Sequence, residues 1–528
     1  MKIDELIINE LIKSRANNRA DLDFLKRKVA KKYKIPMPSN IRLLKLYHEL
    51  LKEKRVKKSK KIENLLKTRP VRSLSGIVNV SVLTKPYPCP GRCLYCPLEA
   101  GIPKSYLSGE PAVERAKKMN YNPFSQVKTR IESLDNQGHP TDKIELRIIG
   151  GTWSFYPKNY QTYFIKRCFD ACNREEGKTL KEVQKRNERA KHKIVGLSVE
   201  TRPDFITKTE IKRMRKLGIT RVELGVQSTY DDVLKLNIRG HGVQETILAT
   251  KLLKDTGFKI CYQMMLNLLG SNLKKDKKMF EELFRKPDFR PDLLKIYPCA
   301  LLKEAPLYRF WKRGKYRPYT KKRLINLIKE VKKKIPYYVR IQRIARDIPS
   351  PRIIAGGSKL LNVRQVIARK IKSEGWRCRC IRCREIREDY NPKEKLKLFR
   401  QDYRASGGRE IFLSFENKNR SKLYSLLRLR VSSQCNEERP RYIIPVLEGA
   451  AIIREVHTYG QLVPVAERKK LAPQHQGLGK KLIREAEKII KKEWGLNKIT
   501  VIAAVGTRDY FRKLGYRLKD EYMIKSLS

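Results

Sequence analysis

Acidic residues are scarce in this sequence relative to basic ones. Its 528 residues include 55 Asp and Glu against 120 Lys and Arg, so the formal net charge is +65 at pH 7. Such an excess repels itself in a compact chain, and binding to a polyanion relieves that repulsion. The charge balance therefore favours nucleic acid as a partner over the alternative, a surface of merely solvated lysines.

Long apolar runs are also missing. No segment approaches the roughly 20 consecutive apolar residues of a membrane span, and the N-terminal stretch lacks the pattern of a secretory signal peptide. Both absences argue against a membrane protein and predict a cytoplasmic location. Hydrophobic residues still make up 40% of the chain, enough for the three or four domains that its length allows at about 150 residues each.

Cysteines are few, and they are unevenly spread. Six of the eleven lie in two tight clusters, a distribution that indicates metal ligands in a reducing compartment rather than disulfides.

The first cluster is a C-x3-C-x2-C loop formed by Cys89, Cys93 and Cys96, with prolines and a glycine around it. Three thiolates at this spacing can hold three irons of a 4Fe-4S cluster and leave the fourth iron open to the amino and carboxylate groups of S-adenosylmethionine (SAM). Leu94 and Tyr95 would shield the cluster. A structural zinc site is the alternative, but it normally takes four protein ligands, and no fourth Cys or His is near in the sequence.

Short apolar segments alternate with helical ones behind this loop. The six predicted strands are 77–83, 144–149, 194–199, 221–226, 259–266 and 293–297. Such alternation predicts a parallel sheet with right-handed crossovers, here a partial (β/α)6 barrel with a side opening. The cysteine loop follows the first strand, so the chemistry is expected at the carboxyl ends of the strands.

Polar or glycine-rich turns follow three of these strands. The candidate SAM-binding residues in them are Gly150, Gly151 and Thr152 after the second strand, Glu200 after the third and Gln227 after the fourth. Glycines in such a turn let backbone groups approach a ligand closely. Further on, arginines alternate with apolar residues over 337–349, which predicts a strand with a basic face, either contacting nucleic acid or ion-paired within the fold.

The second cluster contains Cys378, Cys380 and Cys383 among arginines. Structural zinc is the natural metal for it, with Cys435 as the candidate fourth ligand.

The last part of the chain changes character. Strands are predicted at 410–415, 426–431 and 450–457, and a glycine-rich turn then opens an amphipathic helix, with Gln476, Gly477, Leu478, Gly479 and Lys480 at its start. Backbone N–H groups in such a turn point at a pyrophosphate, as in GNAT acetyltransferases, which bind acetyl-CoA. A dinucleotide-binding turn is the alternative, but it requires G-x-G-x-x-G in a βαβ unit.

Taken together, these motifs resemble the catalytic-subunit family of Elongator, which modifies the wobble uridine of tRNA, in its archaeal single-chain form. The resemblance covers almost the whole chain and is carried by PCPGRCLYCP, IIGGTWSFYPKNYQTYF, VETRPD, ELGVQS, DLLKIYP, RDIP, CRCIRCRE, SGGREIFLSFE, QHQGLG and VGTRDYFRKLGY. It implies a basic helical tRNA-binding region (1–75), a radical SAM barrel (76–349), a linker with a Cys-rich zinc knot (350–405) and a GNAT α+β domain (406–528).

The resemblance also implies a reaction. A SAM-derived radical would take hydrogen from the methyl of acetyl-CoA, and the carbon radical would add to the 5-position of the uracil and leave a carboxymethyl group after hydrolysis. The matching positions are Lys143 and Tyr510 for catalysis, and for acetyl-CoA binding Lys143, Glu455, Val456, His457, Thr458, Gln476 to Lys480, and Phe511, which stands where the family usually has a tyrosine.

An electron donor for the cluster is expected as a partner, and the sequence leaves a homodimer open. Two other hypotheses remain: a protein lysine acetyltransferase whose iron–sulfur cluster is structural, and a basic tRNA-binding scaffold without activity.

Overall fold

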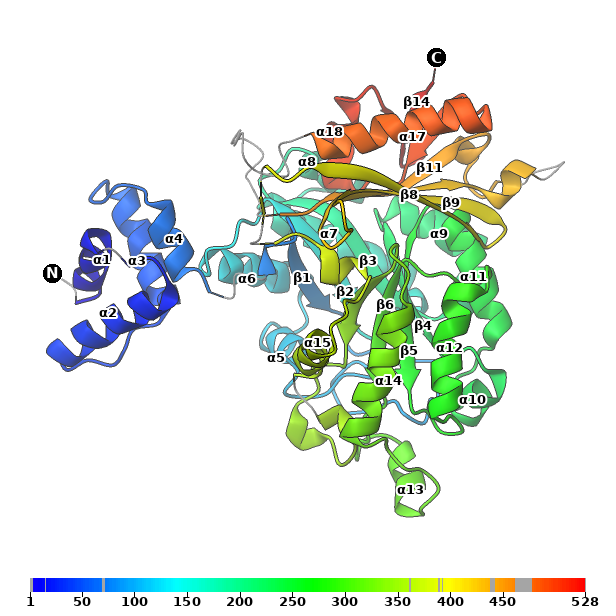
Figure 1. Ribbon diagram of the computed structural model, residues 1–528, viewed down its shortest axis with the longest axis horizontal. Helices are drawn as coiled ribbons and strands as arrows, with labels where there is room; N and C mark the ends of the chain where they lie inside the picture. Colours follow the sequence, from blue (N-terminus) through cyan, green and yellow to red (C-terminus); the bar gives the residue numbers. More distant parts are fainter. Residues whose placement is uncertain are drawn as a thin grey trace.

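The N-terminal helices form a separate bundle with a core of its own. The computed structural model (Figure 1) describes residues 3–14, 16–68, 72–359, 362–387, 390–391, 393–436, 442–460 and 477–527. The bundle comprises α1 (Ile3–Lys13), α2 (Arg19–Lys32), α3 (Asn40–Lys52) and α4 (Lys60–Leu66). Its buried apolar side chains include Ile7, Leu22, Leu43 and Leu66. Figure 1 shows the bundle standing to one side of the other elements, as expected for an independent basic module.

Parallel strands form the central sheet, in the order β1-β2-β3-β4-β5-β6-β7. They are β1 (Val78–Leu83), β2 (Lys143–Ile149), β3 (Lys193–Thr201), β4 (Arg221–Gln227), β5 (Lys259–Leu266), β6 (Leu293–Pro298) and β7 (Arg340–Ile344). The first six agree closely with the predicted strands. The segment with alternating arginines supplies β7, which pairs in parallel with β6.

Helices connect the strands and cover the outer face of the sheet. They are α5 (Pro111–Lys118), α6 (Pro123–Asp135), α7 (Lys158–Asn173), α8 (Leu180–Asn187), α9 (Lys208–Lys216), α10 (Asp231–Leu236), α11 (Val243–Asp255), α12 (Leu273–Arg285), α13 (Leu307–Lys312), α14 (Lys321–Lys334), α15 (Val363–Ser373) and α16 (Ile381–Arg384). The alternation of parallel strands and helices confirms the predicted α/β barrel.

A second, mostly antiparallel sheet follows, in the order β13-β14-β12-β11-β10-β9-β8. Its strands are β8 (Leu396–Ala405), β9 (Gly408–Asn417), β10 (Leu423–Val431), β11 (Ala451–Thr458), β12 (Lys498–Val501), β13 (Arg517–Lys519) and β14 (Tyr522–Ser526), with α17 (Leu478–Trp494) and α18 (Arg508–Arg512) beside them. β8 falls inside the expected linker and pairs with β9 along its whole length, so the sheet begins ten residues before residue 406.

One pair in this sheet is parallel and short. β11 and β12 are in register from Ala451 opposite Ile499 to Ile453 opposite Val501. Beyond that point β11 continues to Thr458 without β12 as its neighbour, because β12 ends at Val501. The two strands therefore open a space beside the start of α17.

The second sheet packs against the amino ends of the barrel strands. Lys259, the first residue of β5, pairs with Glu455 on β11 at 3.0 Å, and Asp292, just before β6, pairs with Arg454 at 2.5 Å. His457 Nε2 lies 2.8 Å from the carbonyl oxygen of Ser75, shortly before β1. The cysteine loop follows the carboxyl end of β1, so it lies at the opposite end of the barrel from this sheet.

Among the described helices, none is long and apolar enough to cross a membrane.

Candidate active site

The cysteine loop gathers its thiols around one glycine. An added Cβ on Gly91 would lie 3.5 Å from Cys93 Sγ and 3.8 Å from Cys89 Sγ. Backbone hydrogen bonds fix the loop against the barrel, from Leu94 N–H to the Asn237 carbonyl at 3.1 Å and from Leu307 N–H to the Leu94 carbonyl at 2.8 Å. These bonds attach the irregular loop to the barrel on both sides of Leu94.

A neighbouring cation and burial both influence whether these thiols are ionised. Arg239 donates from Nη1 to Cys93 Sγ at 3.6 Å. Burial, and then the neighbouring Cys93, raises the pKa of Cys96 to about 12. Because a buried thiol ionises only when a cation compensates its charge, the loop suits a positively charged metal centre.

The spacing of the thiols distinguishes the two cysteine clusters. Cys378, Cys380 and Cys383 form the one group of three or more Cys, His, Asp or Glu side chains in the described ranges whose ligand atoms all lie within 4.8 Å of one another. Thiolates on a single tetrahedral zinc are about 3.8 Å apart. The second cluster therefore suits one ion, while the more widely spread thiols of Cys89, Cys93 and Cys96 suit separate irons of one cluster.

Cys435 does not join the second cluster. Its sulfur lies 3.7 Å from the hydroxyl of Tyr442, and its side chain packs against the core of the second sheet. The expectation of a fourth ligand at Cys435 is corrected accordingly, since nearness along the chain does not bring this residue to the cluster. Lys332 Nζ instead lies 3.5 Å from Cys383 Sγ.

The glycine turn after β2 lies directly beside the cysteine loop. Gly150 has φ +117°, and a Cβ there would lie 2.2 Å from Thr84 Oγ1, so only glycine is accommodated. Thr152 Oγ1 lies 3.7 Å from Cys89 Sγ. Thr152 of this turn thus lies next to Cys89, the first of the three predicted cluster ligands.

A cavity of about 90 Å³ opens at the carboxyl ends of the strands. Its lining joins Tyr95 and Pro97 of the cysteine loop to Glu200, near the end of β3, and to Gln227, the last residue of β4. Gln227 has φ +71°, an uncommon conformation for a non-glycine residue that often marks a functional position. Two strand-end residues chosen from sequence therefore share one cavity with the cysteine loop.

Ionised side chains inside the barrel support this cavity. Lys295 on β6 donates to Glu200 Oε1 at 2.7 Å, and Tyr106 donates to Glu200 Oε2 at 3.0 Å. Burial opposes the charge on Lys295, but Glu200 and Glu223 outweigh it and hold its pKa above the ordinary value. Sequence reasoning missed Lys295, Tyr106 and Arg239. A lysine inside an otherwise apolar strand was the available signal for Lys295.

The second candidate site lies at the start of α17. Gly477 has φ +68°, and an added Cβ on Gly479 would lie 3.3 Å from Tyr510 Oη, 3.6 Å from Thr458 Oγ1 and 3.7 Å from Val456 Cγ1. The structure thus brings the predicted residues of β11, α17 and α18 together where β11 and β12 diverge. Leu478 is buried and Lys480 is exposed, and Gln476 lies outside the described residues.

Two of the predicted acetyl-CoA-binding residues also make contacts within the fold. Phe511 is 5% exposed and packs edge-on against Tyr516 at a ring distance of 5.7 Å. Burial opposes ionisation of Glu455, but Lys259 and Arg428 outweigh it and hold its pKa below the ordinary value. Glu455 is therefore an ionised residue of the interface between the two sheets.

Lys143 is the first residue of β2, at the amino end of the barrel. It lies in register with Lys193 of β3, and an added Cβ on Gly506, just before α18, would lie 2.7 Å from Lys193 Cβ. Burial lowers the pKa of Lys143. This lysine is therefore on the side of the barrel that faces α18 and Tyr510, far from the cysteine loop.

A parallel barrel with a three-cysteine loop at the carboxyl ends of its strands defines a radical SAM protein, an iron–sulfur enzyme that uses SAM. Family models agree: residues 87–283 match the Radical SAM superfamily, and residues 291–373 match the Radical_SAM C-terminal domain.

Relatives along the whole chain narrow this class. The tRNA uridine(34) acetyltransferase of Methanocaldococcus infernus is 43% identical over 99% of this chain and 98% of its own. Human Elongator complex protein 3 is 38% identical over 99% and 96%. The solved structure of M. infernus Elp3 with an N-terminal deletion gives a TM-score of 0.74 at 42% identity, covering 86% of this chain and 100% of that one. The chain belongs to this tRNA uridine(34) acetyltransferase and Elongator complex protein 3 family of enzymes.

Proposed function

We propose that this enzyme installs a carboxymethyl group on the 5-position of the wobble uridine of tRNA, using SAM and acetyl-CoA. The relatives named as tRNA uridine(34) acetyltransferases support the substrate. The single structural observation that carries the proposal is that one barrel bears both candidate sites, with the cysteine loop at one end and the acetyltransferase-like sheet at the other.

At the carboxyl end, Cys89, Cys93 and Cys96 would hold the 4Fe-4S cluster. That cluster supplies the electron for reductive cleavage of SAM. Gly150 and Thr152 would lie along bound SAM, with Glu200 and Gln227 across the cavity. Tyr106 and Lys295 fix both oxygens of the Glu200 carboxylate, so its orientation is set before SAM arrives.

At the amino end, the turn at Gly477 and Gly479 would receive the pyrophosphate of acetyl-CoA at the positive end of α17. The exposed Lys480 would add a cation, and Tyr510 would lie against the thioester. Lys143 lies at the same end of the barrel, at the start of β2, and burial lowers its pKa, which favours the neutral form that a proton acceptor requires.

The two sites are separated along the barrel axis. β2 runs from Lys143 to Ile149, and at about 3.3 Å per residue its ends lie roughly 20 Å apart. The acetyl group would therefore have to cross the barrel, or the sites would have to be used in succession. A coupled reaction predicts that SAM cleavage depends on the contents of the far site.

Other parts of the proposal are supported by charge and composition. The basic N-terminal bundle suits the tRNA backbone, and the sulfur spacing of Cys378, Cys380 and Cys383 suits zinc. A low-potential electron donor is required by the chemistry. A cytoplasmic location goes with this proposal, and a homodimer remains open.

The decisive experiment is anaerobic, with the reconstituted cluster. We expect 5′-deoxyadenosine to form from SAM only when tRNA and acetyl-CoA are both present, with 5-carboxymethyluridine in the tRNA digest. Acetylated lysines on added protein, with SAM uncleaved, would contradict the proposal and favour the protein acetyltransferase.

A further inference from the structure

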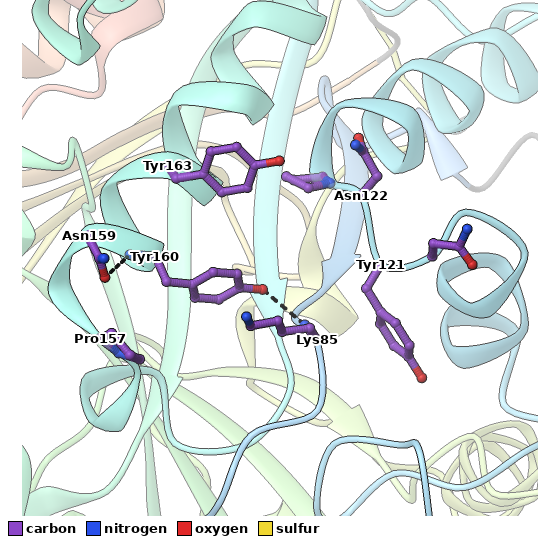
Figure 2. A pocket seen from close by; sticks show the side chains of 9 residues that line it. Lys85, Tyr121, Asn122, Pro157, Asn159, Tyr160 and Tyr163 are labelled. Carbon is purple, nitrogen blue, oxygen red and sulfur yellow. Dashed lines mark hydrogen bonds between the residues drawn. The ribbon is translucent and has the colours of Figure 1, made fainter.

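A cavity on the described surface lies outside both candidate sites. It has a volume of about 610 Å³ and lies beside the carboxyl end of β1. Its lining consists of Lys85, Asn120, Tyr121, Asn122, Pro123, Pro157, Asn159, Tyr160 and Tyr163. Figure 2 shows Tyr160 and Tyr163 projecting from one helix, α7, with Lys85 and Asn122 across from them.

This lining has the chemistry that recognises an unstacked nucleotide. Tyr163 is 47% exposed, and its ring lies tilted at 6.5 Å from that of Tyr160, so part of this aromatic side chain is open to a base that stacks on it. Asn120 is exposed and Asn122 is partly buried. Asn122 Oδ1 accepts the Ser125 N–H at 3.0 Å as the N-cap of α6, so Asn122 offers its amide NH2 group as a donor to a base edge, whereas the Asn120 amide can both donate and accept. Lys85 is exposed at the rim, where it supplies a cation for a phosphate.

The pocket wall is continuous with the segment that carries the first cluster ligand. Tyr160 Oη accepts a hydrogen bond from the Lys85 N–H at 3.0 Å, and Tyr156 Oη donates to the Lys85 carbonyl at 2.8 Å. The rings of Tyr160 and Tyr156 are stacked at 5.3 Å, and those of Tyr156 and Tyr87 at 5.0 Å. Tyr87 is two residues before Cys89, so one aromatic row joins the pocket to the cysteine loop.

We infer that this pocket binds a single unstacked nucleotide of the RNA substrate, next to the nucleotide that enters the SAM cavity. The inference rests on the proposed function, because it takes the substrate to be RNA. The volume exceeds what a side chain needs and lies in the range of ligand pockets, and the pocket opens on the same end of the barrel as the cysteine loop. A nucleotide in the pocket would fix the position of Lys85. Through Lys85 it would hold the cysteine loop in the conformation that binds the iron–sulfur cluster.

Binding of two RNAs tests the inference. The probes are an anticodon stem–loop and a fully paired duplex of the same length, titrated against the full chain by fluorescence anisotropy. Tyr163→Ala should weaken stem–loop binding about 5- to 150-fold and leave duplex binding unchanged. Tyr163→Phe, which keeps the stacking face, should bind as the parent does. Leu398→Ala removes another exposed apolar side chain, on β8, and serves as the matched control.

Position is tested separately by photocrosslinking. A stem–loop with 4-thiouridine at single loop positions should crosslink to the peptide that contains Tyr160 and Tyr163 from one position and not from the others. Equal loss of stem–loop and duplex binding in Tyr163→Ala, or no loss, would overturn the inference. So would saturable binding of free uridine monophosphate that the stem–loop does not displace, because the pocket would then serve a free nucleotide.

These outcomes are separable from failure of the proposed function. If the parent enzyme makes 5-carboxymethyluridine while Tyr163→Ala binds the stem–loop normally, the pocket inference fails alone. If the parent cleaves no SAM in the presence of tRNA and acetyl-CoA, the proposed function fails, and the binding data still decide whether this pocket holds an RNA base.

Discussion

Lys259 Nζ lies 3.0 Å from Glu455 Oε1, so the first residue of β5 is ion-paired to β11 of the second sheet. Arg428 on β10 binds the second oxygen of the same carboxylate at 2.8 Å. Glu455 is therefore shared between the barrel and the sheet that bears the acetyltransferase-like turn. The interface is built from buried charge, which makes the relative placement of the two candidate sites sensitive to single substitutions.

Loss of Arg454 should destabilise this interface strongly. Its guanidinium is fully buried between Asp292 at 2.5 Å and Glu410 at 2.8 Å, and Arg454→Met would leave both carboxylates with less compensation. Breaking such a buried pair typically costs about 3–5 kcal/mol, measurable by urea unfolding. Arg400→Met, which removes partly exposed pairs with Glu493 and Asp402, should cost less than about 1 kcal/mol. Equal losses of unfolding free energy in the two variants would contradict a stabilising role of the buried ion pairs of Arg454.

Acid should weaken the same interface. Burial opposes ionisation of Asp292, but Arg454 and Lys254 outweigh it and hold its pKa well below the ordinary 3.8. A carboxyl whose pKa is lower in the folded chain than in the unfolded chain stabilises the fold at pH values above its unfolded-state pKa. That contribution is lost as the pH falls toward the folded-state pKa. The free energy of unfolding should therefore be steady above about pH 6 and decline below about pH 5. Asp292→Asn should be less stable at neutral pH and decline less steeply, and a parent curve that stays flat under acid would argue against this account.

Cys93→Ser should abolish SAM cleavage and leave tRNA binding intact. The substitution removes one thiolate from the loop but none of the basic residues of the bundle. Iron content and 5′-deoxyadenosine formation are the measurements, with tRNA affinity alongside. Cys435→Ser is the matched control, because this cysteine lies against Tyr442 and the second core, and we expect both iron and zinc contents to be unchanged. Normal SAM cleavage by Cys93→Ser would refute the cluster assignment.

Gly479→Ala should lower acetyl-CoA affinity with little change in stability. The added methyl would lie 3.3 Å from Tyr510 Oη and 3.6 Å from Thr458 Oγ1, where it narrows the space in which the ligand is proposed to bind. We expect at least a tenfold higher Kd, about 1.4 kcal/mol, by calorimetry. Lys488→Ala, an exposed position on the same helix, should bind acetyl-CoA as the parent does. A similar effect of the two substitutions would place the ligand elsewhere.

Deletion of residues 1–66 should weaken tRNA binding and reduce its salt dependence. Each phosphate contact contributes about 0.9 to the slope of log K against log salt on duplex, and the basic run from Lys52 to Lys61 holds seven cationic residues. The measurement is tRNA affinity at several salt concentrations. Replacing Lys488 and Lys492 on α17 by Gln tests whether the loss of cationic side chains outside the bundle has the same effect, and an unaltered slope in the deletion would reject a role of the bundle in tRNA binding.

Prediction of the fold succeeded where local pattern and burial agree. The six segments became β1 to β6 within one or two residues at their ends, because the buried strands of a parallel sheet are rich in apolar residues, although the barrel interior also holds ionised side chains such as Lys295 and Glu223. β8 was missed because it is an edge strand in which only Tyr403 and Ala405 are buried, so its residues lack a clear apolar alternation. Cys435 was misjudged for a related reason, since position in sequence does not fix which core a side chain joins.

The sequence by itself determined the motifs that carry the chemistry, because each motif is a short continuous segment. These motifs are three cysteines in one loop, a glycine turn after β2, and glycines at the start of α17. Only the tertiary structure decided where these groups stand relative to one another. Parallel strands have two distinct ends, and the pairs Lys259–Glu455 and Asp292–Arg454 join residues far apart in the chain. Those long-range ion pairs fix the second sheet at the amino ends of the barrel strands, opposite the cysteine loop, and thereby separate the two sites.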